Sequence, residues 1–116
     1  MGAAGYEGEE AVVKSEANIQ GAILIALSEA GCLVWRQNTG AYKDKTGRVI
    51  RYGLCVGSSD IIGITPSGQF LAVEVKTATG RIRPEQQRFI DAVNRAGGRA
   101  GVARSAEDAL RIANGG

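Results

Sequence analysis

Histidine is absent from this sequence, and cysteine and proline occur only twice each. The lack of histidine excludes Ser-His-Asp triads, histidine-based zinc sites and any general base formed by an imidazole. Hydrolytic chemistry in this chain must therefore use carboxylates, lysine, tyrosine or serine, with or without a cation held by oxygen atoms. A long apolar run is also missing: none approaches the roughly 18 residues that a membrane span needs. We therefore expect no membrane insertion.

The two cysteines and the N-terminus indicate a reducing environment. Cys32 and Cys55 are far apart and flanked by apolar residues, a pattern that favours small core thiols over a disulfide or a metal pair. The N-terminus has no basic region followed by an apolar stretch, so we expect no secretory signal and a cytoplasmic location. Residues 1–13 are rich in glycine, alanine and glutamate without periodicity. We expect a flexible segment there, followed by a single domain over residues 14–116.

Charge is segregated along the chain, although the net charge is only +2. Residues 1–16 carry four acids against one lysine, and residues 36–51 carry five basic residues against Asp44. Residues 76–104 carry seven basic residues against two acids. This distribution favours one face that meets a polyanion. Solvated basic loops would give the same pattern, so charge alone does not decide between the two interpretations.

The hydrophobic periodicity predicts an α/β domain with the element order α-β-β-β-α-β-α and a mixed central sheet flanked by helices. The turn "TPSG" predicts an antiparallel hairpin, and the helix before the last strand predicts a parallel crossover. The polar stretch "TGAYKDKTGRVIRYG" is predicted to be a long loop over residues 39–53. The predicted helices are residues 15–31, 84–98 and 106–114, and the predicted strands are residues 32–38, 60–64, 70–76 and 100–103.

Three charged residues interrupt the apolar strands, namely Asp60, Glu74 and Lys76. Because side chains alternate along a strand, Glu74 and Lys76 share one face. The short turn of the hairpin would place Asp60 near Glu74. Two carboxylates that lie this close repel each other, so they shift in pKa or bind a cation, and Mg²⁺ suits such oxygen ligands. Lys76 would then position water or stabilise charge on a phosphate.

A simpler interpretation of the same residues is a solvent-exposed salt bridge between Glu74 and Lys76, with Asp60 as a strand-end cap. The tripeptide E-x-K is frequent by chance and favours that interpretation. The hairpin spacing of Asp60, the preceding acidic helix and the downstream "PEQQ" together favour the metal site. The basic stretch has a similar ambiguity. Its charges and tyrosines suit contact with a nucleic-acid backbone or an unpaired base, or form a solvated loop; they are Tyr42, Lys43, Lys45, Arg48, Arg51 and Tyr52.

Asp60, "EVK" and Gln86 together resemble the PD-(D/E)xK nuclease superfamily, which has a restriction-endonuclease-like core. More narrowly, "RQNTGAYKDKTGRVIRYG", "GSSDIIGI", "EVKTATGR" and "PEQQRFI" are similar to the VRR-NUC (virus-type replication-repair nuclease) group, in particular its small stand-alone, phage-like members. The likeness covers nearly all of the chain from Ser15 to about Asn114. One departure is that Ser59-Asp60 stands where the superfamily has Pro-Asp.

The resemblance assigns roles to individual residues. Asp60 and Glu74 match metal ligands, the carbonyl of Val75 matches a third ligand, and Lys76 matches the catalytic lysine. Gln86 matches a glutamine that touches the site, whereas Gln87 is expected on the helix surface. Two further sets are implied: Glu16 as an acid on the first helix that approaches the metal, and Arg36 and Asn38 as phosphate contacts. Glu16 also suits the dipole of its own helix, and Arg36 and Asn38 also suit an exposed strand end. Trp35 is expected in the core.

The function implied by the resemblance is a structure-selective DNA endonuclease that depends on Mg²⁺, with Mn²⁺ as an alternative. The expected substrate is branched DNA, in particular a four-way (Holliday) junction, and symmetric cleavage of a junction implies a homodimer. Two other nuclease types remain open, a flap-type and a restriction-like enzyme. A non-catalytic nucleic-acid-binding module and an interaction domain without any nucleic-acid role are the alternatives from other classes.

Overall fold

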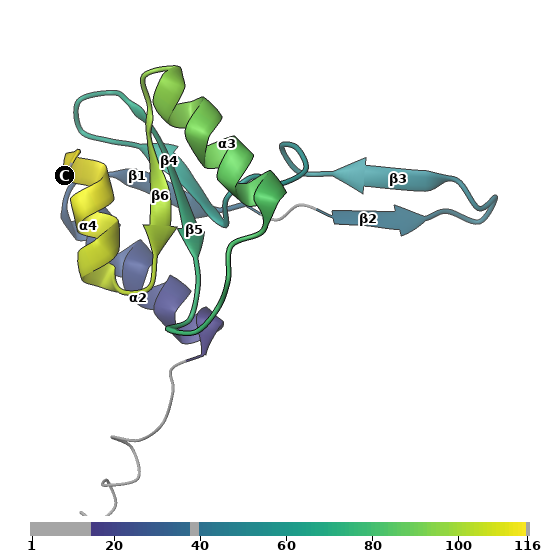
Figure 1. Cartoon of the computed structure of the whole chain (residues 1–116), viewed down its shortest axis with the longest axis horizontal. Helices are drawn as coiled ribbons and strands as arrows, with labels where there is room; N and C mark the ends of the chain where they lie inside the picture. Colours follow the sequence, from purple (N-terminus) through teal and green to yellow (C-terminus); the bar gives the residue numbers. More distant parts are fainter. Residues whose placement is uncertain (1–14, 38–39, 116) are drawn as a thin grey trace, which may run out of the picture.

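A computed structural model describes residues 15–37 and 40–115 and shows a mixed α/β fold whose central sheet is flanked by helices (Figure 1). The fold class and the mixed sheet agree with the prediction. Two additional short strands interrupt the predicted order. The elements are α2 (Glu16–Glu29), β1 (Leu33–Arg36), β2 (Gly40–Lys43), β3 (Val49–Tyr52), β4 (Ile61–Ile64), β5 (Phe70–Val75), α3 (Pro84–Arg95), β6 (Arg99–Ala103) and α4 (Ala106–Asn114).

The central sheet has the strand order β1-β4-β5-β6. Strand β4 is antiparallel to both β1 and β5, whereas β5 and β6 are parallel because α3 provides the crossover between them. The turn between β4 and β5 closes through a hydrogen bond of 2.8 Å from the Gly68 N–H to the Thr65 carbonyl. The predicted hairpin and the predicted parallel crossover are thus confirmed.

Local signals in the sequence determine where the helices begin. The hydroxyl of Ser15 accepts a hydrogen bond from the Asn18 N–H at 3.1 Å, and Pro84 occupies the first turn of α3. The hydroxyl of Ser105 accepts from the Asp108 N–H at 3.1 Å, which starts α4. None of these helices is long and apolar enough to cross a membrane, and the same holds throughout residues 15–37 and 40–115.

The two faces of the sheet have different coverings. Val73 and Val75 are fully buried in the main hydrophobic core, together with side chains from α2 and α4. Each such burial stabilises the fold by about 1.5–3 kcal/mol. Ala72 and Glu74, which alternate with these valines along β5, project to the opposite face. There α3 lies, and Gln86 contacts Glu74. Figure 1 shows α3 and α4 on either side of β6.

Trp35 is not a core residue, contrary to the sequence prediction. Its side chain is 44% exposed. It pairs with Ile62 and lies on the edge strand β1. Helix α3 covers β5 and β6, which lie towards the opposite edge of the sheet. Cys55 is also exposed, while Cys32 is buried and both thiols are free. Both differences have one cause: an apolar residue is buried only if another element covers its position, and local sequence does not specify that cover.

Residues 40–52 form a hairpin where a loop was predicted. β2 and β3 pair in antiparallel fashion and extend away from the rest of the molecule (Figure 1). The Asp44 carboxylate organises the turn, because Oδ1 accepts from the N–H groups of Thr46 and Arg48, both at 2.9 Å. The Thr46 hydroxyl also donates to Oδ1. This bond above all, and then the bond from the Arg48 N–H, lower the pKa of Asp44. Gly47 has a φ of 87°, which favours glycine. The turn signal "DKTG" was present in the sequence, but the charges beside it favoured a loop.

Gly63→Ala should destabilise the protein by about 1–3 kcal/mol, because the new methyl group has no room. A Cβ atom at Gly63 would lie 2.2 Å from the Leu33 carbonyl oxygen and 2.6 Å from Cγ1 of Val34. Urea unfolding measures the change. Gly21→Ala is the control, since nothing lies within 4 Å of a Cβ atom there, and in a helix interior alanine should stabilise by up to about 1 kcal/mol. Equal stability of Gly63→Ala and wild type would contradict the close β1–β4 packing.

Candidate active site

Asp60 lies next to the β4–β5 hairpin and opposite Glu74. Ile61 pairs with Val73, and the register continued by one residue places Asp60 across from Glu74 on the face covered by α3. Asp60 is held there by the backbone, because its Oδ2 accepts a hydrogen bond of 2.9 Å from the Val75 N–H. The hairpin therefore brings the two acids together, as the spacing in the sequence predicted.

Glu74 is the most unusual group of the sheet, because its carboxylate is buried at 2% exposure. Oε2 accepts a hydrogen bond of 3.0 Å from Nε2 of Gln86 and lies 3.6 Å from Nζ of Lys76. Oε1 is buried and has no hydrogen-bond partner among the described residues. Burial above all, and then the charge of Asp60, raise the pKa of Glu74 to about 8, against the opposing effect of Lys76. Such a carboxylate has a strong affinity for a proton or a cation.

Gln86 is oriented by the start of α3. Its Oε1 accepts a hydrogen bond of 2.9 Å from the Arg83 N–H, so that Nε2 faces Glu74. Gln86 is itself buried. Gln87, one residue further, instead donates to Asp91 at 2.8 Å on the outer surface of the helix. The different roles expected for the two neighbouring glutamines agree with this arrangement.

Lys76 is partly shielded, since its side chain is 15% exposed. Its ion pair with Glu74 is therefore not the solvent-exposed salt bridge of the simpler interpretation. The backbone beyond it is also anchored: the Lys76 N–H donates to the Ala103 carbonyl at 3.1 Å, and Nη1 of Arg104 donates to the Gly80 carbonyl at 2.8 Å. Arg104, one of the basic residues of the C-terminal half, thus holds the loop that follows the lysine.

Two buried serines beside Asp60 were missed by sequence reasoning. The hydroxyl oxygens of Ser58 and Ser59 are buried and have no hydrogen-bond partner within residues 15–37 and 40–115. Together with Oε1 of Glu74, they leave buried polar atoms unsatisfied around one short stretch of backbone, which is costly unless a ligand or water satisfies them. The only signal in the sequence was Ser59 in the place of the superfamily proline.

Several predicted site residues do not join the acids. Glu16 is exposed in the first turn of α2, which packs on the opposite face of the sheet. No group of three acidic, cysteine or histidine residues suited to a metal occurs in the described ranges. Arg36 pairs with Ile61, so alternation directs it to the face opposite Glu74. Asn38 lies outside the described residues. Val75, by contrast, does contact the acids, because its N–H donates to Asp60 while its side chain lies in the core.

The basic side chains between residues 40 and 52 are distributed along the projecting hairpin. Lys43 ends β2, Lys45 lies in the turn and Arg51 lies on β3, and all three are exposed. Arg48 is also exposed and pairs with Asp44 at 3.2 Å. The Tyr42 side chain is exposed, and that of Tyr52 lies outside the described set. These basic side chains are exposed, and the hairpin that carries them extends away from the main sheet (Figure 1).

Comparison with known proteins identifies a family for most of the chain. The sequence matches the family model described as "VRR-NUC domain" over residues 14–107. A solved structure described as "VRR_NUC domain" superposes with a TM-score of 0.58 and 23% sequence identity, over 85% of this chain and 94% of that one. At this identity the structural likeness shows the fold alone. No curated protein matches the sequence.

Proposed function

This chain belongs to the VRR-NUC domain family, and from that premise we propose that it is a metal-dependent, structure-selective endonuclease that cleaves four-way DNA junctions. Membership makes it a nuclease of the PD-(D/E)xK type with DNA as its substrate, and such nucleases generally use divalent metal ions. The observation that carries the metal-dependent assignment is the carboxylate of Glu74, which is buried beside Asp60 and whose Oε1 accepts no hydrogen bond from the described residues. This carboxylate has Asp60 and Lys76 as its charged neighbours.

The residues present fit a hard divalent cation. Asp60 and Glu74 offer carboxylate oxygens, and Mg²⁺ is commonly bound by one or two carboxylates together with water and substrate phosphate. We propose that Asp60, Glu74 and the carbonyl of Val75 hold Mg²⁺, with Mn²⁺ as an alternative. When bound, such a cation would neutralise charge on the phosphate and lower the pKa of water. Glu16 is proposed only as a contact through water, because it is exposed on α2.

The protein groups around the cation position have separate tasks. The N–H of Val75 orients Asp60, and Gln86 orients Glu74 through a single amide that the start of α3 holds in place. Lys76 supplies a positive charge on the side of Glu74, where it would orient the attacking water or stabilise charge developing on the phosphate. Because Lys76 is partly shielded from solvent, its charge acts there with little screening.

The hairpin formed by β2 and β3 is proposed to contact the DNA backbone, since a two-stranded ribbon fits the major groove. Exchanging both Lys43 and Lys45 for alanine should weaken binding and reduce the slope of log K against log salt by about 1 to 2, because each phosphate contact contributes roughly 0.9. Fluorescence anisotropy over a salt series measures this slope. Arg95→Ala, at the far end of α3, is the control and should leave the slope unchanged. An unchanged slope in the hairpin variant would remove the hairpin from the interface.

A junction resolved symmetrically needs two active sites related by a two-fold axis. Since residues 15–37 and 40–115 hold one such acid cluster, formed by Asp60 just before β4 and Glu74 on β5, we propose that the protein works as a homodimer. Native mass spectrometry at micromolar protein should then show a species of twice the 12.1 kDa chain mass. A purely monomeric mass would argue against symmetric junction resolution and would favour a flap-type nuclease on the same fold, which cuts one strand.

The decisive test of the proposed function is a time course with end-labelled four-way junction, flap and linear duplex of matched length, each with Mg²⁺ or EDTA. We expect fast cleavage of the junction, little cleavage of the duplex and none with EDTA. Preferential cleavage of the flap would assign the flap-type function instead. If no substrate is cleaved with Mg²⁺ or Mn²⁺ although DNA is bound, the protein is a non-catalytic nucleic-acid-binding module.

A further inference from the structure

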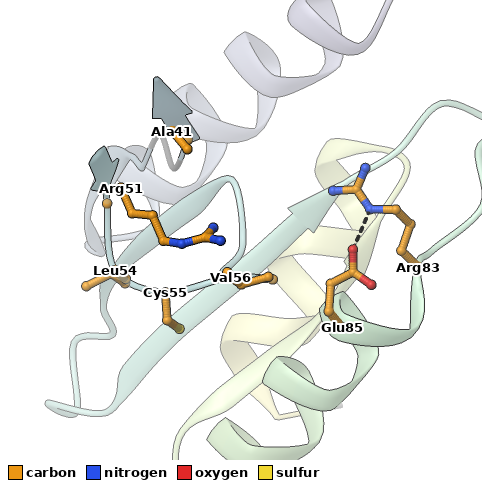
Figure 2. A pocket seen from close by; sticks show the side chains of 10 residues that line it. Ala41, Arg51, Leu54, Cys55, Val56, Arg83 and Glu85 are labelled. Atoms are coloured by element: carbon orange, nitrogen blue, oxygen red, sulfur yellow. Dashed lines mark ion pairs between the residues drawn. The ribbon is translucent and has the colours of Figure 1, made fainter. Parts of the chain in front are cut away.

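A cavity of about 470 Å³ lies where the base of the β2–β3 hairpin meets the first turn of α3. Ala41 and Arg51 come from the hairpin, Leu54 and Val56 from the loop after it, and Glu85 from α3 (Figure 2). Pockets that bind small ligands occupy about 300–1,000 Å³, so the space is sufficient for a nucleobase. None of the acids proposed to hold metal lines this cavity, which makes it a separate feature.

The loop over residues 53–57 has a defined conformation that exposes apolar side chains. Gly53 and Gly57 have φ angles of 96° and 88°. A Cβ atom at Gly57 would lie 2.4 Å from the Glu85 carbonyl oxygen, so the loop backbone lies directly against α3. In this arrangement Val56 is 65% exposed and faces the cavity (Figure 2). Exposed apolar side chains that line a cavity favour a ligand with an apolar surface.

The charged groups of the cavity are two arginines and one glutamate. Nε of Arg83 lies 3.0 Å from Oε2 of Glu85, so this arginine is paired, and the Glu85 carboxylate would repel a phosphate placed against it. Figure 2 shows the Arg51 guanidinium extending over Val56 towards that ion pair. Apolar walls with a planar guanidinium are suited to stacking on an unpaired base, and a carboxylate can accept from its N–H groups.

The cavity is connected to the acid cluster through one residue. The Arg83 N–H donates to Oε1 of Gln86 at 2.9 Å, and Nε2 of Gln86 donates to Oε2 of Glu74 at 3.0 Å. Arg83 and Glu85 line the cavity while Gln86, the next residue, contacts the buried acid. A base bound in the cavity would therefore belong to DNA close to the DNA strand that reaches the acid cluster.

We propose that this cavity receives one unpaired nucleobase of the bound DNA, next to the strand that is cleaved. This inference rests on the proposed nuclease function and adds a reason for its selectivity. A continuous duplex has no unpaired base to offer, whereas a branch point exposes bases at low cost because they are already unstacked there. The cavity would thus favour branched DNA without reading its sequence.

The test compares two branched DNAs that differ at one position, where one has an unpaired nucleotide at the branch and the other an abasic analogue. Both carry the same phosphates, so their affinity ratio isolates the base. Fluorescence anisotropy in EDTA measures binding without cleavage. Wild type should bind the base-containing DNA at least about fivefold more tightly, as expected for one stacked base. Val56→Ser should bring this ratio close to one, and so should Ala41→Leu, which fills the cavity without a change in charge.

Ile25→Ser is the matched control, because Ile25 is 62% exposed but lies on α2, away from the cavity. It should keep the ratio of wild type, and thermal melting should show that all variants fold. A wild-type ratio of one, or an unchanged ratio in both cavity variants, overturns the inference. Cleavage of the same DNAs with Mg²⁺ separates the two proposals. If wild type cleaves DNA but its affinity ratio is one, the nuclease proposal stands and the base-site proposal fails. A high ratio without cleavage in Mg²⁺ or Mn²⁺ retains the base site and removes the nuclease.

Discussion

Lys76→Ala should lower the rate of junction cleavage at saturating DNA by roughly 10²- to 10³-fold, the usual effect of removing one preorganised group that stabilises transition-state charge. The structural reason is that Nζ of Lys76 lies 3.6 Å from Oε2 of Glu74 and is largely shielded from solvent. Single-turnover cleavage of labelled junction at excess enzyme measures the rate directly.

Lys45→Ala is the matched control for this variant, since it removes the same charge from the exposed turn between β2 and β3. It should raise KM for DNA and leave kcat close to wild type, whereas Lys76→Ala should lower kcat and change KM little. If Lys76→Ala cleaves at the wild-type rate, the assignment of the acid cluster as the active site fails even where the protein binds junction DNA well.

Glu74→Gln should stabilise the metal-free protein at alkaline pH, on the order of 4 kcal/mol at pH 9. Burial and Asp60 raise the pKa of Glu74 from the ordinary 4.5 to about 8 in the folded protein. The folded state therefore retains a proton that the unfolded state releases, so the free energy of unfolding falls as pH rises from about 4.5 to about 8. Above that window the cost of the buried charge is fully present, and glutamine avoids it while keeping a similar shape.

Urea unfolding in EDTA at pH 5, 7 and 9 measures this difference, with Glu29→Gln as the control because Glu29 is an exposed residue at the end of α2. The stability difference between wild type and Glu74→Gln should grow with pH, whereas Glu29→Gln should follow wild type. Added Mg²⁺ at pH 9 should raise the Tm of wild type and not that of Glu74→Gln, since only a ligand that binds the folded state stabilises it. Parallel pH profiles for wild type and Glu74→Gln would show that Glu74 does not titrate as an isolated buried acid.

The pairing of Asp60 with Glu74 was accessible from the sequence because both lie on one hairpin. A short turn determines the register of an antiparallel pair, and a strand has a fixed period of two, so facing residues can be counted from the turn. The same counting places Lys76 beside Glu74. Gln86 was identified only through its resemblance to a family motif, since its contact with Glu74 depends on where α3 crosses the sheet.

Positions that depend on how distant elements pack were harder to predict from the sequence. Glu16 was predicted to approach the metal and Arg36 to contact phosphate; α2 packs on the other face of the sheet, and alternation along β1 directs Arg36 to that face, so both roles stay predictions. The sequence predicts a loop over residues 39–53, because the polar residues and charges there obscure two short strands. The cavity beside Val56 was not foreseen, because it is formed by three segments that are separate in the chain.

The order of the helices and main strands, the β4–β5 register and the grouping of Asp60, Glu74 and Lys76 could be predicted before the fold was known. These are consequences of local geometry: capping residues, turn residues and the periods of helix and strand operate over a few neighbouring positions. The packing of distant segments was needed to show that Glu74 is buried, that its Oε1 accepts no hydrogen bond from the described residues and that α3 joins a cavity to the acids. Burial and the resulting pKa depend on what covers a side chain, and that cover comes from residues distant in the chain.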